Sequence, residues 1–190
     1  PDPDELGRVY RPDLAICDPE LTLTLPPRLT AATGMDALTH CVEGYLSTRD
    51  NPPLQAVALD GIARVVRYVE RATADGQDRE ARAGMLMAAL EGGMSIWNGL
   101  GPIHSLSMAF GDSPLHHGTL VTVAMPAVMR FYGGLPGGKL ERIAMAMGLE
   151  AGCRRVWGVA PDPGQPRRRI RRGGPALSTQ SPQRRQVLPV

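Results

Sequence analysis

One helical pattern runs from Pro27 to about Leu149, and it limits the fold more than any other feature of this sequence. Within it, Asn51-Pro52-Pro53 supplies a helix cap followed by first-turn prolines. Apolar side chains then recur at the 3.6-residue helical period and mark one face, at Leu54, Ala58, Ile62, Val65, Val66 and Val69. This pattern predicts an amphipathic helix that packs against other helices.

A second long helix is predicted from near Asp78 toward Trp97, with Asn98-Gly99 as its end. The pair Gly92-Gly93 inside it favours close helix–helix packing, because each glycine costs about 1 kcal/mol relative to alanine in an exposed helix. Further helical stretches are expected over residues 102–110, 117–132 and 137–148. The central part of the chain is therefore predicted to be mainly α, a helical bundle.

The amino-terminal segment lacks the helical pattern of the central part. Residues 1–26 are rich in Pro and Asp and contain one predicted short strand, Leu14–Cys17, which Asp18-Pro19 would stop. The chain starts at Pro1, and no basic segment followed by an apolar run indicates a secretion signal, so we expect the natural start to be missing.

Composition excludes several classes of protein. A chain of 190 residues allows one domain of ordinary size, and no stretch reaches the roughly 20 apolar residues of a membrane span. Three widely spaced cysteines form neither a disulfide framework nor a structural zinc site. We therefore expect a cytoplasmic protein without a membrane partner.

The last 40 residues have a strongly basic composition. Residues 151–190 hold nine arginines against the single Asp162. Too few apolar residues remain to offset the entropy of ordering, so disorder is predicted. A basic tail that binds nucleic acid is one interpretation. Arg outnumbers Lys twenty to one in the chain, as expected from GC-rich coding DNA, and a shifted frame in such DNA yields Arg, Pro, Gly and Ala. We therefore favour a shifted reading frame near residues 150–153 and expect no nucleic-acid partner.

The four histidines lie in two short regions. In the first, Asp36 and His40 are four residues apart, so on a helix both side chains can reach one metal ion. A hydrogen bond at the surface explains that pair equally well. In the second, His104 and His117 would lie about 20 Å apart on one straight helix. The interruption at Gly111-Asp112-Ser113-Pro114 can turn the chain back and bring the two rings together.

One carboxylate and three imidazoles form a mixed oxygen and nitrogen donor set. Such a set suits Fe(II) or Zn(II) far better than Mg²⁺ or Ca²⁺. An isolated histidine in a helical bundle is usually a hydrogen-bonded core or surface residue. Four candidates that folding could bring together make a metal site the better interpretation.

Several motifs together resemble the iron-containing (group III) alcohol dehydrogenase family over about residues 8–149. They occur in order along the chain, at Asp18–Thr22, Leu25-Pro26, Ala32–Tyr45, Gly99–Phe110 and His117-Gly118. The resemblance implies the C-terminal helical domain of that family, with a dehydroquinate synthase-like fold.

The resemblance also implies the site residues. Asp36, His40, His104 and His117 would bind the metal, with no catalytic residue beyond these ligands. His117 is preferred to His116 because the family's ligand immediately precedes a glycine, here Gly118. A second family histidine commonly lies four residues after the third ligand, where this sequence has Met108.

The resemblance further implies an NAD(P)-dependent alcohol dehydrogenase that interconverts an alcohol and an aldehyde or ketone by metal-assisted hydride transfer. Residues 1–26 would be the link from a missing N-terminal dinucleotide-binding domain, residues 27–149 the truncated metal-binding domain, and residues 150–190 the tail. NAD or NADP would bind through the missing domain, at residues this sequence does not identify. We expect a homo-oligomer in the intact protein, and little activity from this fragment alone. The alternative is a catalytically silent helical module that binds metal or another subunit.

Other residues permit two interpretations. Glu43 either orients a metal ligand or lies in solvent on the helix face. Cys41 is interpreted as a small buried residue. The glycine pairs Gly133-Gly134 and Gly137-Gly138 are interpreted as loop residues, because no strand precedes them as a phosphate-binding loop requires.

Overall fold

A computed structural model describes residues 14–133 and 138–149 of the chain. In these ranges the fold is mainly α, with six α-helices and two short 3₁₀ helices, as predicted. The helices, in chain order, are η1 (Pro19–Thr22), α2 (Pro27–Leu46), α3 (Pro52–Ala74), α4 (Arg79–Ser95), η2 (Ile96–Asn98), α5 (Pro102–Ala109), α6 (His117–Tyr132) and α7 (Lys139–Ala146).

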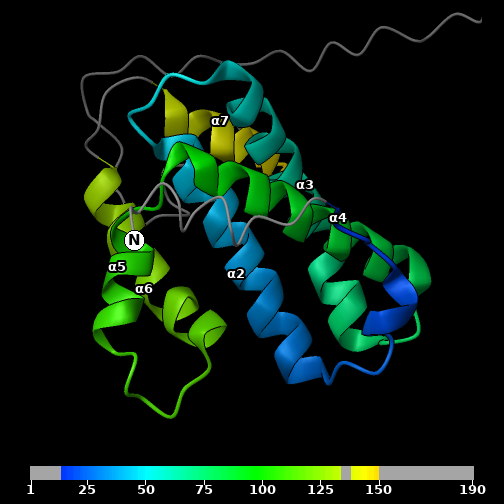
Figure 1. Ribbon diagram of the computed structural model, residues 1–190. Coiled ribbons are helices and arrows are strands. Elements are labelled where there is room, and N and C mark those ends of the chain that lie inside the picture. The colour runs from blue at the N-terminus through cyan, green and yellow to red at the C-terminus, as the bar shows by residue number, and fades with distance from the viewer. Residues whose placement is uncertain (1–13, 134–137, 150–190) are drawn as a thin grey trace, which may run out of the picture.

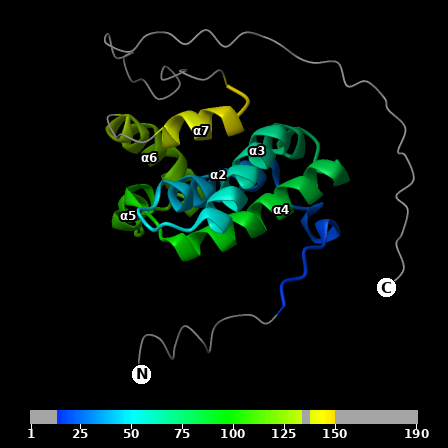
Figure 2. The same ribbon diagram turned by 90° about the horizontal axis from the view of Figure 1, so that it is seen from above.

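Helix α2 runs through the middle of the bundle (Figure 1). Helices α3 and α4 pack along one side of it, and α5 and α6 pack together on the other side. Helix α7 lies against α3 and α2, as the view from above shows (Figure 2). Helix α2 contacts every other α-helix of the bundle. Side chains on its different sides therefore meet different neighbouring helices.

The predicted helix starts are confirmed by side-chain caps. The Asn51 side chain accepts a hydrogen bond from the Leu54 N–H at 3.4 Å, where α3 begins. The Asp78 side chain accepts one from the Ala81 N–H at 3.0 Å, where α4 begins. Such caps satisfy backbone donors that have no partner inside the helix. Gly99, with φ of 108°, ends the segment after η2, as expected for a residue that tolerates this conformation.

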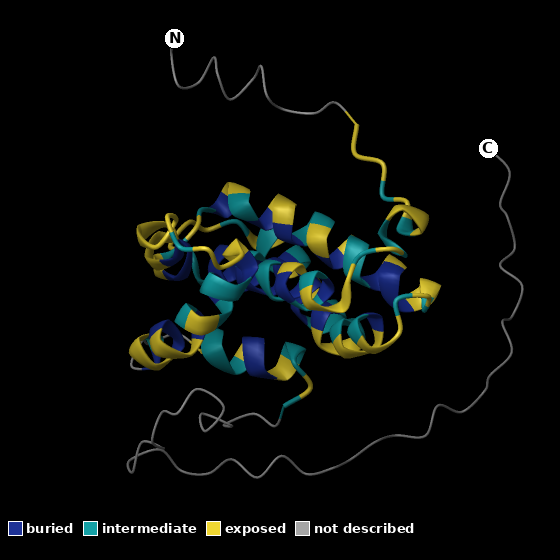
Figure 3. Cartoon of the chain, turned by 90° about the horizontal axis from the view of Figure 1, so that it is seen from below, coloured by how far each residue is buried: buried dark blue, intermediate teal, exposed yellow. Residues whose placement is uncertain are grey.

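The core is one apolar cluster formed by side chains from all six α-helices, α2 to α7. Figure 3 shows buried residues facing inward along the α-helices and exposed residues outside. On α3 the side chains of Ala58, Ile62 and Val65 are fully buried. The prediction that Val66 shares this face is wrong, because Val66 is 43% exposed. Adjacent helix positions point about 100° apart, so Val65 and Val66 cannot both face one narrow core.

Two further expectations need correction. The predicted strand at Leu14–Cys17 is wrong, since these residues form no regular element. Leu14 and Ile16 are more than 70% exposed, and no described residue pairs with them as a neighbouring strand, without which a strand is not stable. The close packing predicted for Gly92-Gly93 holds for Gly92, which lies against Ala37 and His40, but a side chain at Gly93 would meet nothing.

A buried arginine fixes the start of α2. Arg82 of α4 is 3% exposed, and it donates to the Thr30 hydroxyl at 2.8 Å, the Leu25 carbonyl at 3.0 Å and the Gly76 carbonyl at 3.0 Å. Its guanidinium therefore joins the start of α2 to the turn between α3 and α4. The interpretations given above for the tail at 150–190 and for Gly134 and Gly137 fall outside the described residues.

Candidate metal centre

Helix α2 supplies one row of polar side chains at helical spacing. Asp36 and His40 are one turn apart, and the Asp36 Oδ1 lies 4.0 Å from the His40 Nε2. Both side chains are partly buried, at 24% and 22% exposure. Glu43 follows on the next turn and is buried. This row faces helices α5 and α6.

The chain reversal between α5 and α6 brings the other two histidines to this row. His104 lies in the first turn of α5, and His117 is the first residue of α6. The intervening residues form turns and bends, as the Gly111–Pro114 interruption predicts. The ring of His116 accepts a hydrogen bond from the Gly118 N–H at 3.1 Å and caps α6. His116 is thus occupied at the helix end while His117 faces α2.

A glycine allows α6 to approach α2 closely. A Cβ atom at Gly118 would overlap the carbonyl group of Ala32 on α2. This is backbone rather than a flexible side chain, so any larger residue would push the two helices apart. His117 precedes this contact, and the close approach holds its ring over Asp36.

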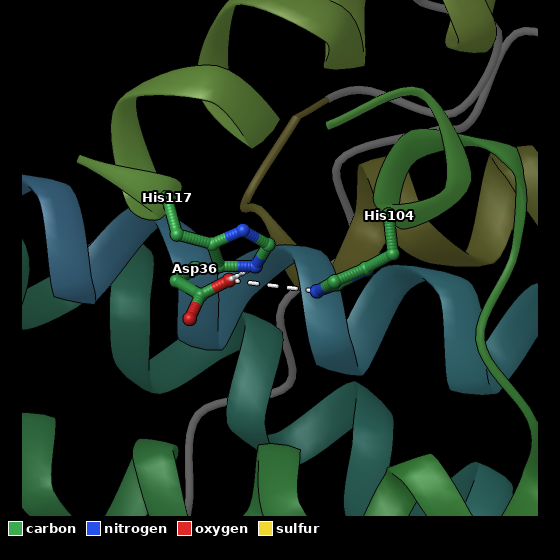
Figure 4. A group of neighbouring side chains, drawn as sticks. All are labelled: Asp36, His104 and His117. Atoms are coloured by element: carbon green, nitrogen blue, oxygen red, sulfur yellow. Dashed lines mark ion pairs between the residues drawn. The ribbon is translucent and has the colours of Figure 1, made fainter. Parts of the chain in front are cut away.

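Three of the four predicted ligands converge on one point. The Asp36 Oδ1 lies 3.5 Å from the His104 Nε2 and 3.5 Å from the His117 Nε2. Figure 4 shows these side chains pointing toward one another from three helices. Donor atoms of the three residues all lie within 4.8 Å of one another. Two atoms bound tetrahedrally about 2.0–2.2 Å from one ion are about 3.3–3.6 Å apart, and the two 3.5 Å separations match this spacing.

The fourth predicted ligand, His40, borders the group. Its ring stacks on that of His104, with centroids 4.6 Å apart and planes 8° from parallel. The stacked arrangement places His40 beside Asp36 and outside the set of three whose donor atoms converge. In the described ranges, these three residues form the one group of His, Cys, Asp and Glu side chains close enough to share an ion.

Two buried atoms of this group have no hydrogen-bond partner, namely the Asp36 Oδ1 and the His104 Nε2. Nearly all buried polar atoms in proteins are hydrogen-bonded, so each exception needs an explanation. Here the two atoms without a hydrogen bond face each other 3.5 Å apart. A divalent cation would satisfy both, so the side chains present fit a metal ion.

The protonation states also suit a cation. The pKa of Asp36 lies below its ordinary value although burial alone would raise it, because the three histidines stabilise the carboxylate. Burial lowers the pKa of His40 although Asp36 opposes the shift. Burial alone would lower the pKa of His104, but the Asp36 and Glu43 carboxylates raise it to about 9. A metal ion that binds here would therefore displace a proton from His104.

Glu43 is the residue for which the sequence left two interpretations open, and the solvated one is wrong. Its side chain is 1% exposed. One oxygen accepts a hydrogen bond from the Ile103 N–H at 2.6 Å, and the other lies 2.6 Å from the His104 Nδ1. No local pattern could reveal this contact, because 61 residues separate Glu43 from His104. Met108, by contrast, is 74% exposed and does not join the group.

Comparison with known proteins identifies the family of this chain. Residues 30–159 match the family model for the C-terminal part of the Fe-containing alcohol dehydrogenase family. The chain is 49% identical over 152 residues to 4-hydroxybutyrate dehydrogenase of Cupriavidus necator, covering 75% of this chain and 40% of that protein. It is 41% identical over 122 residues to NAD-dependent methanol dehydrogenase of Bacillus methanolicus, covering 63% and 32%.

A solved structure shares the fold as well. The crystal structure of 1,3-propanediol oxidoreductase matches with a TM-score of 0.68 at 36% identity, covering 76% of this chain and 37% of that one. The chain belongs to the iron-containing alcohol dehydrogenase family, and the family resemblance read from the motifs is confirmed. It spans about two fifths, or less, of the length of the relatives it matches. No helix within the described ranges has both the length and the apolar character of a membrane span.

Proposed function

We propose that this chain is the metal-bearing part of an NAD(P)-dependent alcohol dehydrogenase, and that Asp36, His40, His104 and His117 hold Fe(II) or Zn(II). The observation that carries the proposal is that two buried atoms, the Asp36 Oδ1 and the His104 Nε2, face each other at 3.5 Å and have no hydrogen-bond partner. The mixed oxygen and nitrogen donors favour a transition metal over Mg²⁺ or Ca²⁺.

The residues have distinct roles in this proposal. When bound, the ion would act as a Lewis acid that polarises the alcohol or carbonyl oxygen. The Asp36 carboxylate contributes the single negative charge, and neutral imidazoles complete the set, so a divalent ion would keep a net positive charge. His104 is 6% exposed and closes the inner side, whereas His117 is 44% exposed and borders solvent. The substrate oxygen would therefore approach on the side of His117.

The hydride acceptor in this proposal is a nicotinamide cofactor. A relative at 41% identity is named as NAD-dependent. Oxidation of an alcohol needs an acceptor for the hydride, and in the reverse direction the reduced nicotinamide returns the hydride to the carbonyl carbon. We place the cofactor in a dinucleotide-binding domain on the N-terminal side of residues 1–26. Residues 1–26 would be the link, and residues 27–149 the metal-binding domain. We also retain a cytoplasmic location and a homo-oligomer as parts of the proposal.

The proposed substrates are small primary alcohols and their aldehydes. Proteins that match this chain are named for 4-hydroxybutyrate, methanol and 1,3-propanediol. The relative at 49% identity makes 4-hydroxybutyrate the first compound to test.

A metal titration followed by an activity assay tests the proposal. The purified chain is loaded with Fe(II) or Zn(II) without oxygen, and bound metal is counted by elemental analysis. We expect one ion per chain and no alcohol-dependent NAD(P) reduction by the chain alone. Fusion behind the dinucleotide-binding half of a related dehydrogenase should restore reduction with 4-hydroxybutyrate.

Each other outcome has a definite meaning. Absence of bound metal would refute the metal centre. Turnover by the unfused chain would refute the assignment of the cofactor to another domain. Metal binding without turnover in the fusion would favour the alternative, a helical module that binds metal without catalysing a reaction.

A further inference from the structure

A buried carboxylate lies directly behind one of the proposed ligands. Glu43 of α2 is not among the residues whose donor atoms converge, yet its side chain is more deeply buried than any of theirs, at 1% exposure. Burial of a carboxylate is costly unless hydrogen bonds or a charge compensate it. The partners of Glu43 therefore indicate why it is there.

Both oxygens of Glu43 are used at the start of α5. The Oε1 accepts from the Ile103 N–H at 2.6 Å. The Oε2 lies 2.6 Å from the His104 Nδ1 and accepts from the His104 N–H at 3.4 Å. Helix α5 has no capping side chain of its own, because its first flanking residue is Gly101. Glu43 thus replaces a local cap from a distant helix.

The contact at Nδ1 fixes which nitrogen of His104 faces the site. An ionised carboxylate only accepts hydrogen bonds, so the His104 Nδ1 must carry a proton. The Nε2 is then the atom with a free lone pair in the neutral ring, and it points at the Asp36 Oδ1 from 3.5 Å. The arrangement matches a metal-binding histidine whose second nitrogen donates to a carboxylate.

Gly101 makes room for this carboxylate. A Cβ atom at Gly101 would lie 2.6 Å from the Glu43 Oε1 and 3.0 Å from its carboxyl carbon. The backbone of Gly101 is extended, with φ of −122°, so an alanine is allowed there by its own conformation. The absence of a side chain at Gly101 is therefore explained by the carboxylate and not by the backbone.

We infer that Glu43 is a positioning residue that acts through His104, fixing the tautomer and direction of the ring so that Nε2 binds the metal ion. The inference rests on the proposed metal site. It assigns a role to a residue that neither binds the ion nor touches the substrate, and it predicts that metal affinity depends on a carboxylate behind the ligand.

Glu43→Gln is the direct test, with Co(II) as an optical probe of the full chain. An amide offers one acceptor and two donors, so it cannot accept from both Ile103 and His104 with the same geometry. We expect Co(II) affinity to fall about 10- to 100-fold, as for other residues that support a metal ligand. The matched control is Glu70→Gln, which removes a carboxylate from an exposed position of α3 and should leave Co(II) affinity unchanged.

A double-mutant cycle separates positioning from a structural role. In a His104→Ala background, a residue that acts through the ring has nothing left to orient, so Glu43→Gln should change Co(II) affinity less than about twofold. A residue that merely caps α5 at Ile103 would weaken binding equally in both backgrounds. That result would overturn the inference.

A second variant keeps the test decisive if Glu43→Gln folds poorly. Gly101→Ala leaves the charge in place but displaces the carboxylate, and it should also weaken Co(II) binding. Unchanged affinity in Gly101→Ala and Glu43→Gln, with Co(II) bound to the wild-type chain, would overturn this inference alone. Absence of Co(II) binding to the wild-type chain would overturn the proposed function as well.

Discussion

Two buried polar groups lie on opposite sides of α2, and they differ in how their atoms are satisfied. On the side of α4, the Arg82 guanidinium has three protein acceptors within 3.0 Å. On the side of α5 and α6, the Asp36 Oδ1 and the His104 Nε2 are buried without a hydrogen-bond partner. Both groups connect α2 to neighbouring helices.

The difference separates structural stabilisation from function. A buried charge whose partners are complete stabilises the fold and has no capacity left for a ligand. Buried atoms that lack partners reduce stability, and they persist where something else supplies the missing interaction. The comparison predicts that substitutions at Arg82 change stability, whereas substitutions at Asp36 change metal binding.

The largest expected effect is at Asp36. Asp36→Asn keeps the shape but removes the negative charge of the donor set. We expect affinity for Zn(II) to fall at least 1,000-fold, equivalent to about 4 kcal/mol at 1.4 kcal/mol per tenfold change. Competition with a chelating indicator measures this loss. Urea unfolding without metal should show a smaller loss of stability than Arg82→Met causes, because Asp36 is partly exposed and loses only its attraction to the histidines. A loss as large as that of Arg82→Met would place Asp36 with Arg82 as a structural residue.

Arg82→Met should have the opposite profile. It removes the Arg82 hydrogen bonds to the Thr30 hydroxyl and to the carbonyls of Leu25 and Gly76, at an expected cost of about 2–3 kcal/mol. The Leu25 carbonyl keeps a hydrogen bond from the Thr30 hydroxyl at 3.3 Å. Urea unfolding measures the cost, with Arg142→Met at an exposed position of α7 as the control. Zn(II) affinity of the folded chain should stay within about twofold of wild type. A parallel loss of affinity would show that the two sides of α2 are not independent.

Glu91 is another case of a buried oxygen without a hydrogen-bond partner. Here a proton on the carboxyl group, and not a metal ion, compensates the burial. Its Oε2 is buried without a hydrogen-bond partner, and burial together with Asp60 raises the pKa of Glu91 to about 7. Between pH 4.5 and about 7, the folded chain therefore holds a proton on Glu91 that the unfolded chain has released. The contribution to stability is complete below pH 4.5 and is lost as the pH rises through 7.

Glu91→Gln should abolish that part of the pH dependence. We expect the wild type to lose about 1–2 kcal/mol more than the variant between pH 5 and pH 8. A tenfold difference in proton affinity between the folded and unfolded chains corresponds to about 1.36 kcal/mol, and the nearby Arg64 and solvent screening reduce the effect. Urea unfolding at several pH values measures the difference. Parallel pH profiles of the two proteins would contradict the raised pKa.

The sequence predicts much of the helical framework because its signals are local. Asn51 with Pro52-Pro53 marked the start of α3, and the Gly111–Pro114 interruption predicted the reversal that brings His104 near His117. The strand at Leu14–Cys17 was wrong because a strand depends on a neighbour that local pattern does not supply. Val66 was wrong because periodicity does not set the width of the buried face.

The candidate site was predictable as a set of residues and less so as a geometry. The i,i+4 spacing placed Asp36 and His40 on one face, but spacing alone does not show that the His40 ring stacks on His104. Glu43 was ambiguous because its partners come from α5, which lies far along the chain. Whether a helix-face carboxylate meets water or an imidazole is decided by tertiary packing. The role of all four residues as metal ligands stays a prediction.

The unequal exposure of His104 and His117 gives the proposed centre a closed side and an open side. Glu43 and α5 lie on the closed side, behind His104, whereas the side of His117 opens to solvent. An ion and an alcohol that both approach from the open side would pass His117. An obstruction at His117 would then slow metal exchange and substrate entry together.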